Sequence, residues 1–215
     1  MPPVIEQLPL GPIETNCYVV RADRGANEAV VVDPSGDAAT IRLRLAGMGA
    51  RCVAILITHG HWDHLLGVAD LAEGTGAPVS MPAGERILLE EPPPGVSPVV
   101  VRAHTPEALL EGGETLTVAG VTLDVVSTPG HSPAHVTYAV DGALLSGDVL
   151  FAGSVGRTDI PGADWEILLA SIRALVETYP AETVVYPGHG PATTLGAELA
   201  RNPFLGDLRV ERREA

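Results

Sequence analysis

Four apolar, strand-like segments of this chain end in the same way, at a tight polar turn that carries histidine or aspartate. The first is "CVAILIT" (52–58), a continuous run rich in β-branched residues, which predicts a buried strand. The other three end in the turns "STPGH" (127–131), "SGD" (146–148) and "PGHG" (187–190). This pattern predicts sheets that hold polar side chains rigidly in open loops.

Strand and helix patterns occur in both halves of the 215-residue chain. Helical spacing of apolar residues predicts helices, and glycine-containing turns between apolar runs predict hairpins. The expected strands lie at 17–22, 29–34 and 77–82, the hairpins around Ala119-Gly120 and Asp141-Gly142, and the helices at 37–49, 65–76, 165–179 and 193–202. An irregular surface excursion is expected over 91–106. We expect one α+β domain over residues 1–215, with two packed sheets and helices outside them.

The charge of the chain disfavours several classes of partner. A formal net charge of −14, without a local cluster of basic residues, repels phosphate backbones and anionic membrane surfaces. No apolar run reaches the roughly 20 residues that a membrane-spanning helix needs. We therefore expect no nucleic-acid partner and no membrane partner.

The first residues and the two cysteines bear on the cellular compartment. The segment "MPPVIEQLPLGPIETNCYVV" lacks the basic start and the apolar stretch of a signal peptide. Cys17 and Cys52 are too few for a disulfide framework, and we expect buried free thiols. A bridge or a metal-binding role for them is the alternative. These features predict a cytoplasmic protein.

The segment "THGHWDH" (58–64) concentrates three of the 7 histidines of the chain and an aspartate in seven positions. Folding alone does not require so many metal-ligating side chains together, although a charged surface loop is the alternative. His59 and His61 are two apart, so both side chains point the same way in extended backbone. Asp63 and His64 lie where the chain turns into a helix and can approach a second ion.

Three further side chains complete a possible metal site. They are His131, Asp148 and His189, and each follows one of the strand-like segments. Imidazole and carboxylate are ligands of zinc, and a catalytic zinc site keeps a position for water. Five histidines and two aspartates match two divalent ions that share a carboxylate and a hydroxide. Zinc is the expected metal, and iron and manganese suit the same ligands.

The motifs "THGHWDH", "PGH", "SGD" and "PGHG" together resemble those of the metallo-β-lactamase superfamily, whose HxHxDH signature is specific. The resemblance extends from "TNCYVV" to "NPFL" and implies an αββα sandwich of two mixed β-sheets with helices on the outer faces. Such a fold has its metal site at the sheet edges. The chain is most similar to short glyoxalase II-like hydrolases, through "GPIETNCYVV", "GDVLFAGSVGRTDIPGAD", "PGHGPATT" and "NPFL".

This resemblance implies a role for each candidate residue. Asp148 would bridge two ions, and Asp63 and Asp148 would be the catalytic residues that fix the ions and orient the hydroxide. The implied ligands are His59, His61 and His131 for one ion, and Asp63, His64 and His189 for the other. Arg157 lies where such enzymes place a basic residue near the substrate's carboxylate; an ion pair with Asp159 is the alternative.

Two other histidines are expected to be structural. His135 follows the third motif closely, and a hydrogen bond that supports the fold is its expected role, with support of the metal site as the alternative. His104 lies in the irregular excursion, far in sequence from the motifs. A lone histidine of this kind is usually a surface residue or a satisfied core residue.

The activity that the resemblance implies is metal-assisted hydrolysis of a thioester, such as an S-2-hydroxyacyl thiol, by a metal-bridging hydroxide. One departure concerns glutathione: full-length glyoxalase II enzymes carry a helical C-terminal extension that binds it, and here the sequence ends at "LRVERREA". A mononuclear-iron persulfide dioxygenase is the first alternative. Lactone or other ester hydrolases and a purely structural zinc site are the others, and the oligomeric state stays open.

Overall fold

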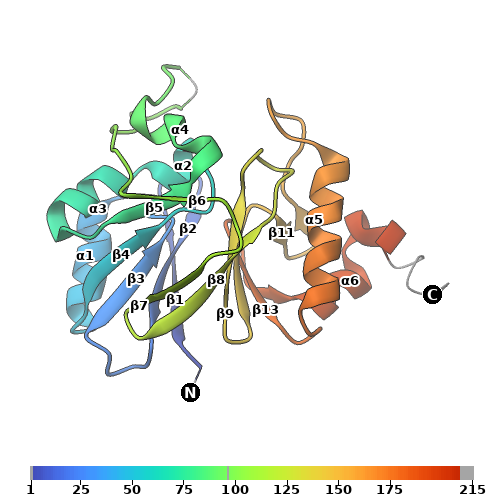
Figure 1. The fold of residues 1–215 in the computed structure, drawn as a ribbon, viewed down its shortest axis with the longest axis horizontal. Coiled ribbons are helices and arrows are strands. Elements are labelled where there is room, and N and C mark those ends of the chain that lie inside the picture. The colour runs from blue at the N-terminus through green and yellow to red at the C-terminus, as the bar shows by residue number, and fades with distance from the viewer. Residues whose placement is uncertain (1, 96, 209–215) are drawn as a thin grey trace.

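The computed structural model describes residues 2–95 and 97–208, which form two six-stranded sheets packed face to face (Figure 1). The strand order is β1-β2-β3-β4-β5-β6 in the first sheet and β14-β13-β10-β9-β8-β7 in the second. Both sheets are mixed, because β3 to β6 run parallel and β13 runs parallel to β10, whereas the other neighbours are antiparallel. No helix of the described residues is long and apolar enough to cross a membrane.

The first sheet consists of β1 (Val4–Leu10), β2 (Thr15–Arg21), β3 (Glu28–Val32), β4 (Arg51–Leu56), β5 (Val79–Pro82) and β6 (Ala108–Leu110). The second consists of β7 (Thr115–Val118), β8 (Val121–Ser127), β9 (Val136–Val140), β10 (Ala143–Gly147), β13 (Val184–Pro187) and β14 (Thr193–Thr194). A separate ribbon is formed by β11 (Leu150–Phe151) and β12 (Ser154–Val155). The helices are α1 (Ala38–Gly47), α2 (Trp62–Leu65), α3 (Val68–Thr75), α4 (Ile87–Glu90), α5 (Trp165–Thr178) and α6 (Leu195–Arg201), with short 3-10 helices η1 (Ala83–Glu85) and η2 (Pro203–Leu205).

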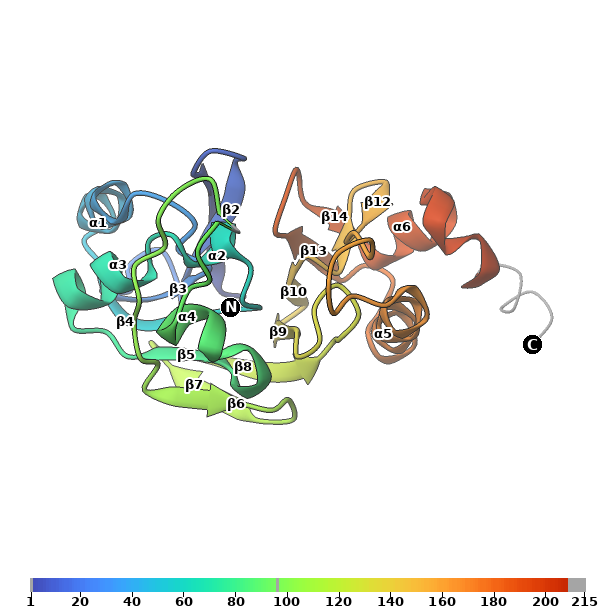
Figure 2. The same ribbon diagram turned by 90° about the horizontal axis from the view of Figure 1, so that it is seen from above.

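Helices cover the outer face of each sheet, α1 and α3 on the first and α5 and α6 on the second (Figure 2). Three apolar clusters fill the spaces between the four layers: one under α1 and α3, one between the sheets, and one under α5 and α6. The αββα sandwich expected from the sequence is confirmed.

The continuous apolar runs are explained by burial on both faces of each sheet. In β2, Cys17 and Val19 pack toward the helices of the first layer, whereas Tyr18 and Val20 pack between the sheets. Successive side chains of a strand point to opposite faces, so both sets must be apolar. Cys17 in β2 and Cys52 in β4 are buried free thiols, as expected.

Local signals place most of the predicted elements correctly. Asp37 caps α1 by accepting hydrogen bonds from the N–H groups of Ala39 and Thr40. Both hairpins form where expected, and the residues at each tip, Ala119-Gly120 and Asp141-Gly142, have positive φ. Positive φ at both central residues gives the twist that two-residue hairpins need.

Several elements differ from the sequence-based expectation, among them α4, β6, β11 and β12, which were not expected, and two of the differences have a clear physical reason. The helix expected over 65–76 is divided into α2 and α3, because the N–H of Gly67 donates to the carbonyl of Pro34 at 2.7 Å. A Cβ at Gly67 would lie 2.4 Å from the carbonyl oxygen of Gly36, so only glycine permits this approach. The edge strand β1 was not expected from its sequence "VIEQLPL", which contains a proline and pairs only with β2.

Candidate metal centre

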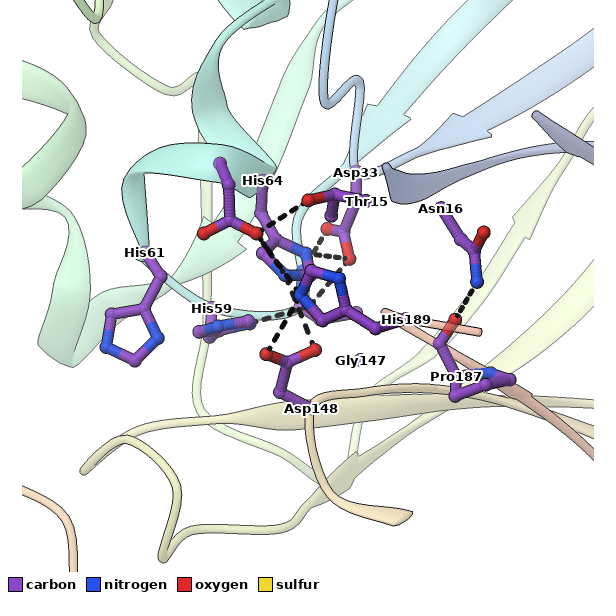
Figure 3. A network of polar contacts seen from close by, with 12 residues as sticks. Thr15, Asn16, Asp33, His59, His61, His64, Gly147, Asp148, Pro187 and His189 are labelled. Carbon is purple, nitrogen blue, oxygen red and sulfur yellow. Dashed lines mark hydrogen bonds and ion pairs between the residues drawn. The ribbon is translucent and has the colours of Figure 1, made fainter. Parts of the chain in front are cut away.

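Strand directions bring the polar turns to one edge of the sandwich. β3 and β4 run parallel in the first sheet, and β8, β10 and β13 share one direction in the second. The turns that follow these strands meet between the sheets (Figures 1 and 3). The ligand atoms fall into three sets, each within 4.8 Å: His59, His61 and His131; His59, His64 and Asp148; and Asp63, His64 and His189.

The structure therefore brings together all seven predicted ligands, and two of the three sets are the two predicted for separate ions. Asp148 lies among three imidazoles: its Oδ1 is 3.5 Å from His64 Nε2, and its Oδ2 is 3.5 Å from both His131 Nε2 and His189 Nε2. It thus contacts histidines of both predicted sets. Metal binding by these residues stays a prediction, supported by their arrangement.

Several buried polar atoms at this edge make no hydrogen bond. Among the described residues, these include His59 Nε2, His64 Nε2 and Asp148 Oδ1. Burying a polar atom without a partner costs about 1–3 kcal/mol. His64 Nε2 and Asp148 Oδ1 are 3.5 Å apart and form an ion-pair contact, which leaves His59 Nε2 without any partner in the described part of the chain. Imidazole nitrogen and carboxylate oxygen are both ligands of zinc. The residues present fit a divalent metal.

Asp33 and Thr58 fix the orientation of two imidazoles. Asp33 Oδ2 lies 2.9 Å from His64 Nδ1, and the carboxylate also accepts the Thr58 N–H at 2.8 Å and the Thr58 hydroxyl at 2.7 Å. Because the Thr58 hydroxyl donates to Asp33, its oxygen accepts from His59 Nδ1 at 3.0 Å. With their Nδ1 atoms held in this way, His59 and His64 turn Nε2 toward the candidate centre.

His131 is oriented by the backbone. Its Nδ1 donates to the carbonyl of Arg157 at 2.9 Å, which leaves Nε2 facing the centre. Across the centre, His61 Nδ1 lies 2.8 Å from this Nε2 atom. Two ring nitrogens that face each other at this distance are placed to share a ligand.

The first two residues of β2 hold the other side of the centre. The Thr15 hydroxyl donates to Asp63 Oδ2 at 2.7 Å, and the Asn16 amide donates to the carbonyls of Pro187 and Gly190 at 2.8 and 2.9 Å (Figure 3). These bonds fix the loop that carries His189. A Cβ at Gly188 would lie 2.0 Å from Asp148 Oδ1, so this position must be glycine.

Charge distribution differs between the two predicted sets. Burial lowers the pKa of His61 to about 4, with a further contribution from His131, and burial also holds the pKa of His59 well below its usual value. On the other side, burial opposes protonation of His189, but Asp148 and Asp63 raise its pKa to about 9. The metal-free protein therefore keeps His59 and His61 neutral and His189 protonated near pH 7.

His135 supports Asp148 and is placed outside the three ligand sets. Its Nε2 accepts the N–H of Asp148 at 3.1 Å, and its Nδ1 lies 3.1 Å from the hydroxyl of Thr128. Burial keeps the pKa of His135 well below its usual value, so the ring stays neutral and Nδ1 is the donor. The hydrogen bond expected for this residue is present.

A buried carboxylate joins the two loops that carry His61 and His131. Glu85, at the end of η1, is 3% exposed. It accepts hydrogen bonds from the Gly60 N–H, from the Ser132 hydroxyl at 2.6 Å and from the Ala134 N–H at 2.9 Å. The first belongs to the "THGHWDH" loop and the other two to the "STPGHSPAH" loop.

Arg157 and His104 belong to none of the three ligand sets. The Arg157 guanidinium forms a bidentate ion pair with Asp159 at 2.7 and 2.9 Å, the alternative given for it above. Its role toward substrate stays a prediction. His104 lies against α4, where its N–H donates to the carbonyl of Leu89 and its Nε2 is 3.7 Å from Glu107.

Sequence reasoning missed the side chains that orient the ligands. These are Thr15, Asn16, Asp33, Thr58 and Glu85. Asp33 follows the apolar run "AVVV" and so carries the same strand-end signal as the ligands. Glu85 carries no such signal, because its partners are distant in sequence.

Comparison with known families identifies the superfamily of the chain. The model of the "Metallo-beta-lactamase superfamily" matches residues 10–189. The chain belongs to this superfamily. Among curated relatives, "Probable metallo-hydrolase YqgX" of Bacillus subtilis is 36% identical over 95% of this chain and 98% of its own. "Hydroxyacylglutathione hydrolase GloC" of Haemophilus influenzae is 30% identical over 94% of this chain and 97% of its own.

Solved structures of the superfamily share the fold. The "BLEG-1 B3 metallo-beta-lactamase" has a TM-score of 0.88 and 41% identity, and covers 94% of this chain and 100% of its own. "TTHA1623 in a di-iron-bound form" has a TM-score of 0.80 and 37% identity over 93% and 100%. "ETHE1 from Myxococcus xanthus" has a TM-score of 0.77 and 26% identity over 94% and 85%. A divalent metal centre is thus a property of the family, and the metal is unresolved.

The two predicted ion positions should differ in proton release. A metal ion must displace the proton of His189, whose pKa is raised to about 9, whereas neutral His59 and His61 have none to lose. We expect calorimetric titration of the metal-free protein with Zn²⁺ at pH 7.5, in buffers of different ionisation heat, to resolve a proton-releasing and a nearly proton-neutral event. Raising the pH by one unit should increase the Zn²⁺ affinity of the proton-releasing event about tenfold for each proton released. Equal release in both events would contradict the assignment.

Glu85→Gln should weaken the hydrogen bonds that join the loops carrying His61 and His131. The amide keeps the size of the side chain but places an N–H₂ group where only acceptors fit, and we expect a loss of about 1–3 kcal/mol in the free energy of unfolding. Urea unfolding of the metal-free protein measures it. Glu91→Gln, at an exposed position nearby, is the matched control and should change stability by less than about 0.5 kcal/mol. Equal stability of the two variants would remove Glu85 from this role.

Proposed function

We propose that this protein is a binuclear metallohydrolase that hydrolyses thioesters of the S-2-hydroxyacyl class. The observation that carries the proposal is the position of Asp148, at 3.5 Å from imidazoles of both predicted ligand sets. A carboxylate between two sets of histidines fits a bridging ligand, because its Oδ2 is near His131 of one set and His189 of the other.

When bound, two divalent ions supply a hydroxide near neutral pH and polarise the substrate's carbonyl group. His59, His61 and His131 would hold one ion, and Asp63, His64 and His189 the other, with Asp148 shared. Zinc is the metal we propose, and iron or manganese suits the same ligands.

The protein's own residues maintain this arrangement through the network around them. Asp33 keeps the Nδ1 side of His64 occupied, so that Nε2 stays directed at the centre. The Thr15 hydroxyl fixes the Asp63 carboxylate by donating to Oδ2, the oxygen that lies 3.4 Å from His189 Nε2. Partners of metal ligands typically contribute 10–100-fold to metal affinity or activity. No protein nucleophile is needed for this hydrolysis, and both cysteines are buried.

The relatives support the hydrolase without naming a substrate for this chain. GloC of Haemophilus influenzae bears the name of a hydroxyacylglutathione hydrolase and matches nearly the full length of both chains. YqgX bears the broader name of a metallo-hydrolase. A thioester of a small thiol is therefore the substrate class we propose. A cytoplasmic location stays a prediction from the sequence.

A mononuclear-iron persulfide dioxygenase is the second candidate. The set of His59, His64 and Asp148 contains two histidines and one carboxylate, the ligand type of many non-haem iron oxygenases. The presence of a further set, with Asp63 and His189, favours the binuclear hydrolase, because a single iron would leave those side chains without a role.

Metal content and two activities measured on one sample distinguish the candidates. We expect about two metal ions per chain by elemental analysis, turnover of S-D-lactoylglutathione, and no oxygen uptake with glutathione persulfide. Loss of a residue that supports a metal ligand typically costs 10–100-fold in activity. Asp148→Asn removes a proposed ligand itself and should lower thioester turnover by at least this factor. One iron with oxygen uptake would contradict the hydrolase and support the dioxygenase. Two metals without either activity would contradict the substrate class.

A further inference from the structure

An apolar pocket opens next to the candidate centre. It has a volume of about 450 Å³ and begins at His61 and Trp62. Leu88 of α4 forms part of its wall, and the rest comes from 92–95 and 97–101, part of the excursion between β5 and β6. Ligand pockets of this size are typically apolar with few polar groups. The pocket and the centre share His61, so an occupant of the pocket lies next to the ligand atoms.

The sequence builds this wall from residues that cannot extend a sheet. Pro92, Pro93, Pro94 and Pro98 lack the N–H group that a β-ladder requires. Arg102 directly follows the lining residues 97–101 and forms ion pairs with Asp70 and Glu73 of α3. Val101 packs against the apolar cluster under α1 and α3.

The lining of the pocket is apolar and open to solvent. Val99 and Val100 are 40% and 87% exposed, and none of the described lining residues carries an acidic or basic side chain apart from the imidazole of His61. Exposed apolar surface gathered beside a concave site is typical of ligand binding. The lining therefore favours an uncharged apolar group.

The basic residues around the centre do not favour a carboxylate in this pocket. The chain contains no lysine, so arginine alone can supply a fixed positive charge. Arg102 pairs with two acidic side chains of α3. Arg157 pairs with Asp159 and lines a second pocket together with Ser154, Trp165 and Phe204. Arg86, which directly precedes α4, lies 3.9 Å from Glu90 and does not line the pocket. The apolar pocket is thus on the α4 side of the centre, and Arg157 is on the β12 side.

We propose that the pocket beside His61 binds an apolar acyl chain several carbons long, with the thioester carbonyl at the metal centre and the thiol portion toward Arg157. This proposal rests on the proposed function and narrows its substrate class. In the reaction, the oxygen of water forms a bond to the acyl carbon and the carbon–sulfur bond breaks. The thiolate takes up a proton, and the products are a carboxylic acid and a thiol.

The test uses a series of 2-hydroxyacyl thioesters of N-acetylcysteamine, an uncharged thiol, with acyl chains of three to eight carbons. For the metal-loaded protein, kcat/KM should rise about two- to fourfold with each added methylene until the pocket is filled. Val99→Asp places a carboxylate in the wall and should abolish this rise. Ile167→Asp, at a position of similar exposure (46%) on α5, is the matched control and should keep it.

A binding measurement separates the pocket from the chemistry. In Trp165→Phe, Trp62 is the one remaining tryptophan, and its fluorescence should respond to S-alkyl thioethers of the same thiol. We expect the dissociation constant to fall with alkyl length, and Val99→Asp to remove this dependence. Turnover of all thioesters with no effect of chain length would overturn the pocket proposal and leave the hydrolase intact. If none of the thioesters is hydrolysed, the proposed function is contradicted. If thioether binding is then also independent of alkyl length, the pocket proposal is overturned as well.

Discussion

Asp148 lies between imidazoles that come from different layers of the sandwich, and the rest of the candidate centre is arranged around it. Its carboxylate is 3.5 Å from nitrogens of His64, His131 and His189. Such a buried group is costly unless it is paired, because its charge has left water. The neighbouring His64 holds the pKa of Asp148 well below its usual value despite burial, so it stays ionised. Pairing of this charge therefore requires that the histidines after the strands of both sheets lie at fixed positions relative to Asp148.

The supporting network explains why the imidazoles keep one orientation. Asp33 holds His64 directly and His59 through Thr58, whereas Glu85 joins the two loops that carry His61 and His131. These carboxylates are almost fully buried and accept several hydrogen bonds each. His59, His64 and His131 are thus oriented by the protein itself, because their Nδ1 atoms already have hydrogen-bond partners.

The strand and helix patterns predicted two packed sheets with helices outside them, and the strand-end motifs predicted the seven side chains that the fold gathers, because each motif is local to one strand and the turn or helix start after it. The division of the helix at Gly67 and the edge strand β1 depend on contacts that the local sequence does not contain. Glu85 is the clearest case. Its partners lie 25 and 47 or more residues away, and its own segment reads as an ordinary surface turn. Local pattern thus predicts the candidate ligands and marks Asp33, whereas the role of Glu85 appears only in its tertiary contacts.

Anomalous diffraction from crystals of the metal-loaded protein, recorded at the absorption edge of the bound metal, tests the central claim most directly. We predict two peaks, one among His59, His61 and His131 and the other among Asp63, His64 and His189, with Asp148 reaching both. A single peak that leaves Asp63 and His189 without contact to metal would contradict the binuclear centre. It would favour the mononuclear alternative.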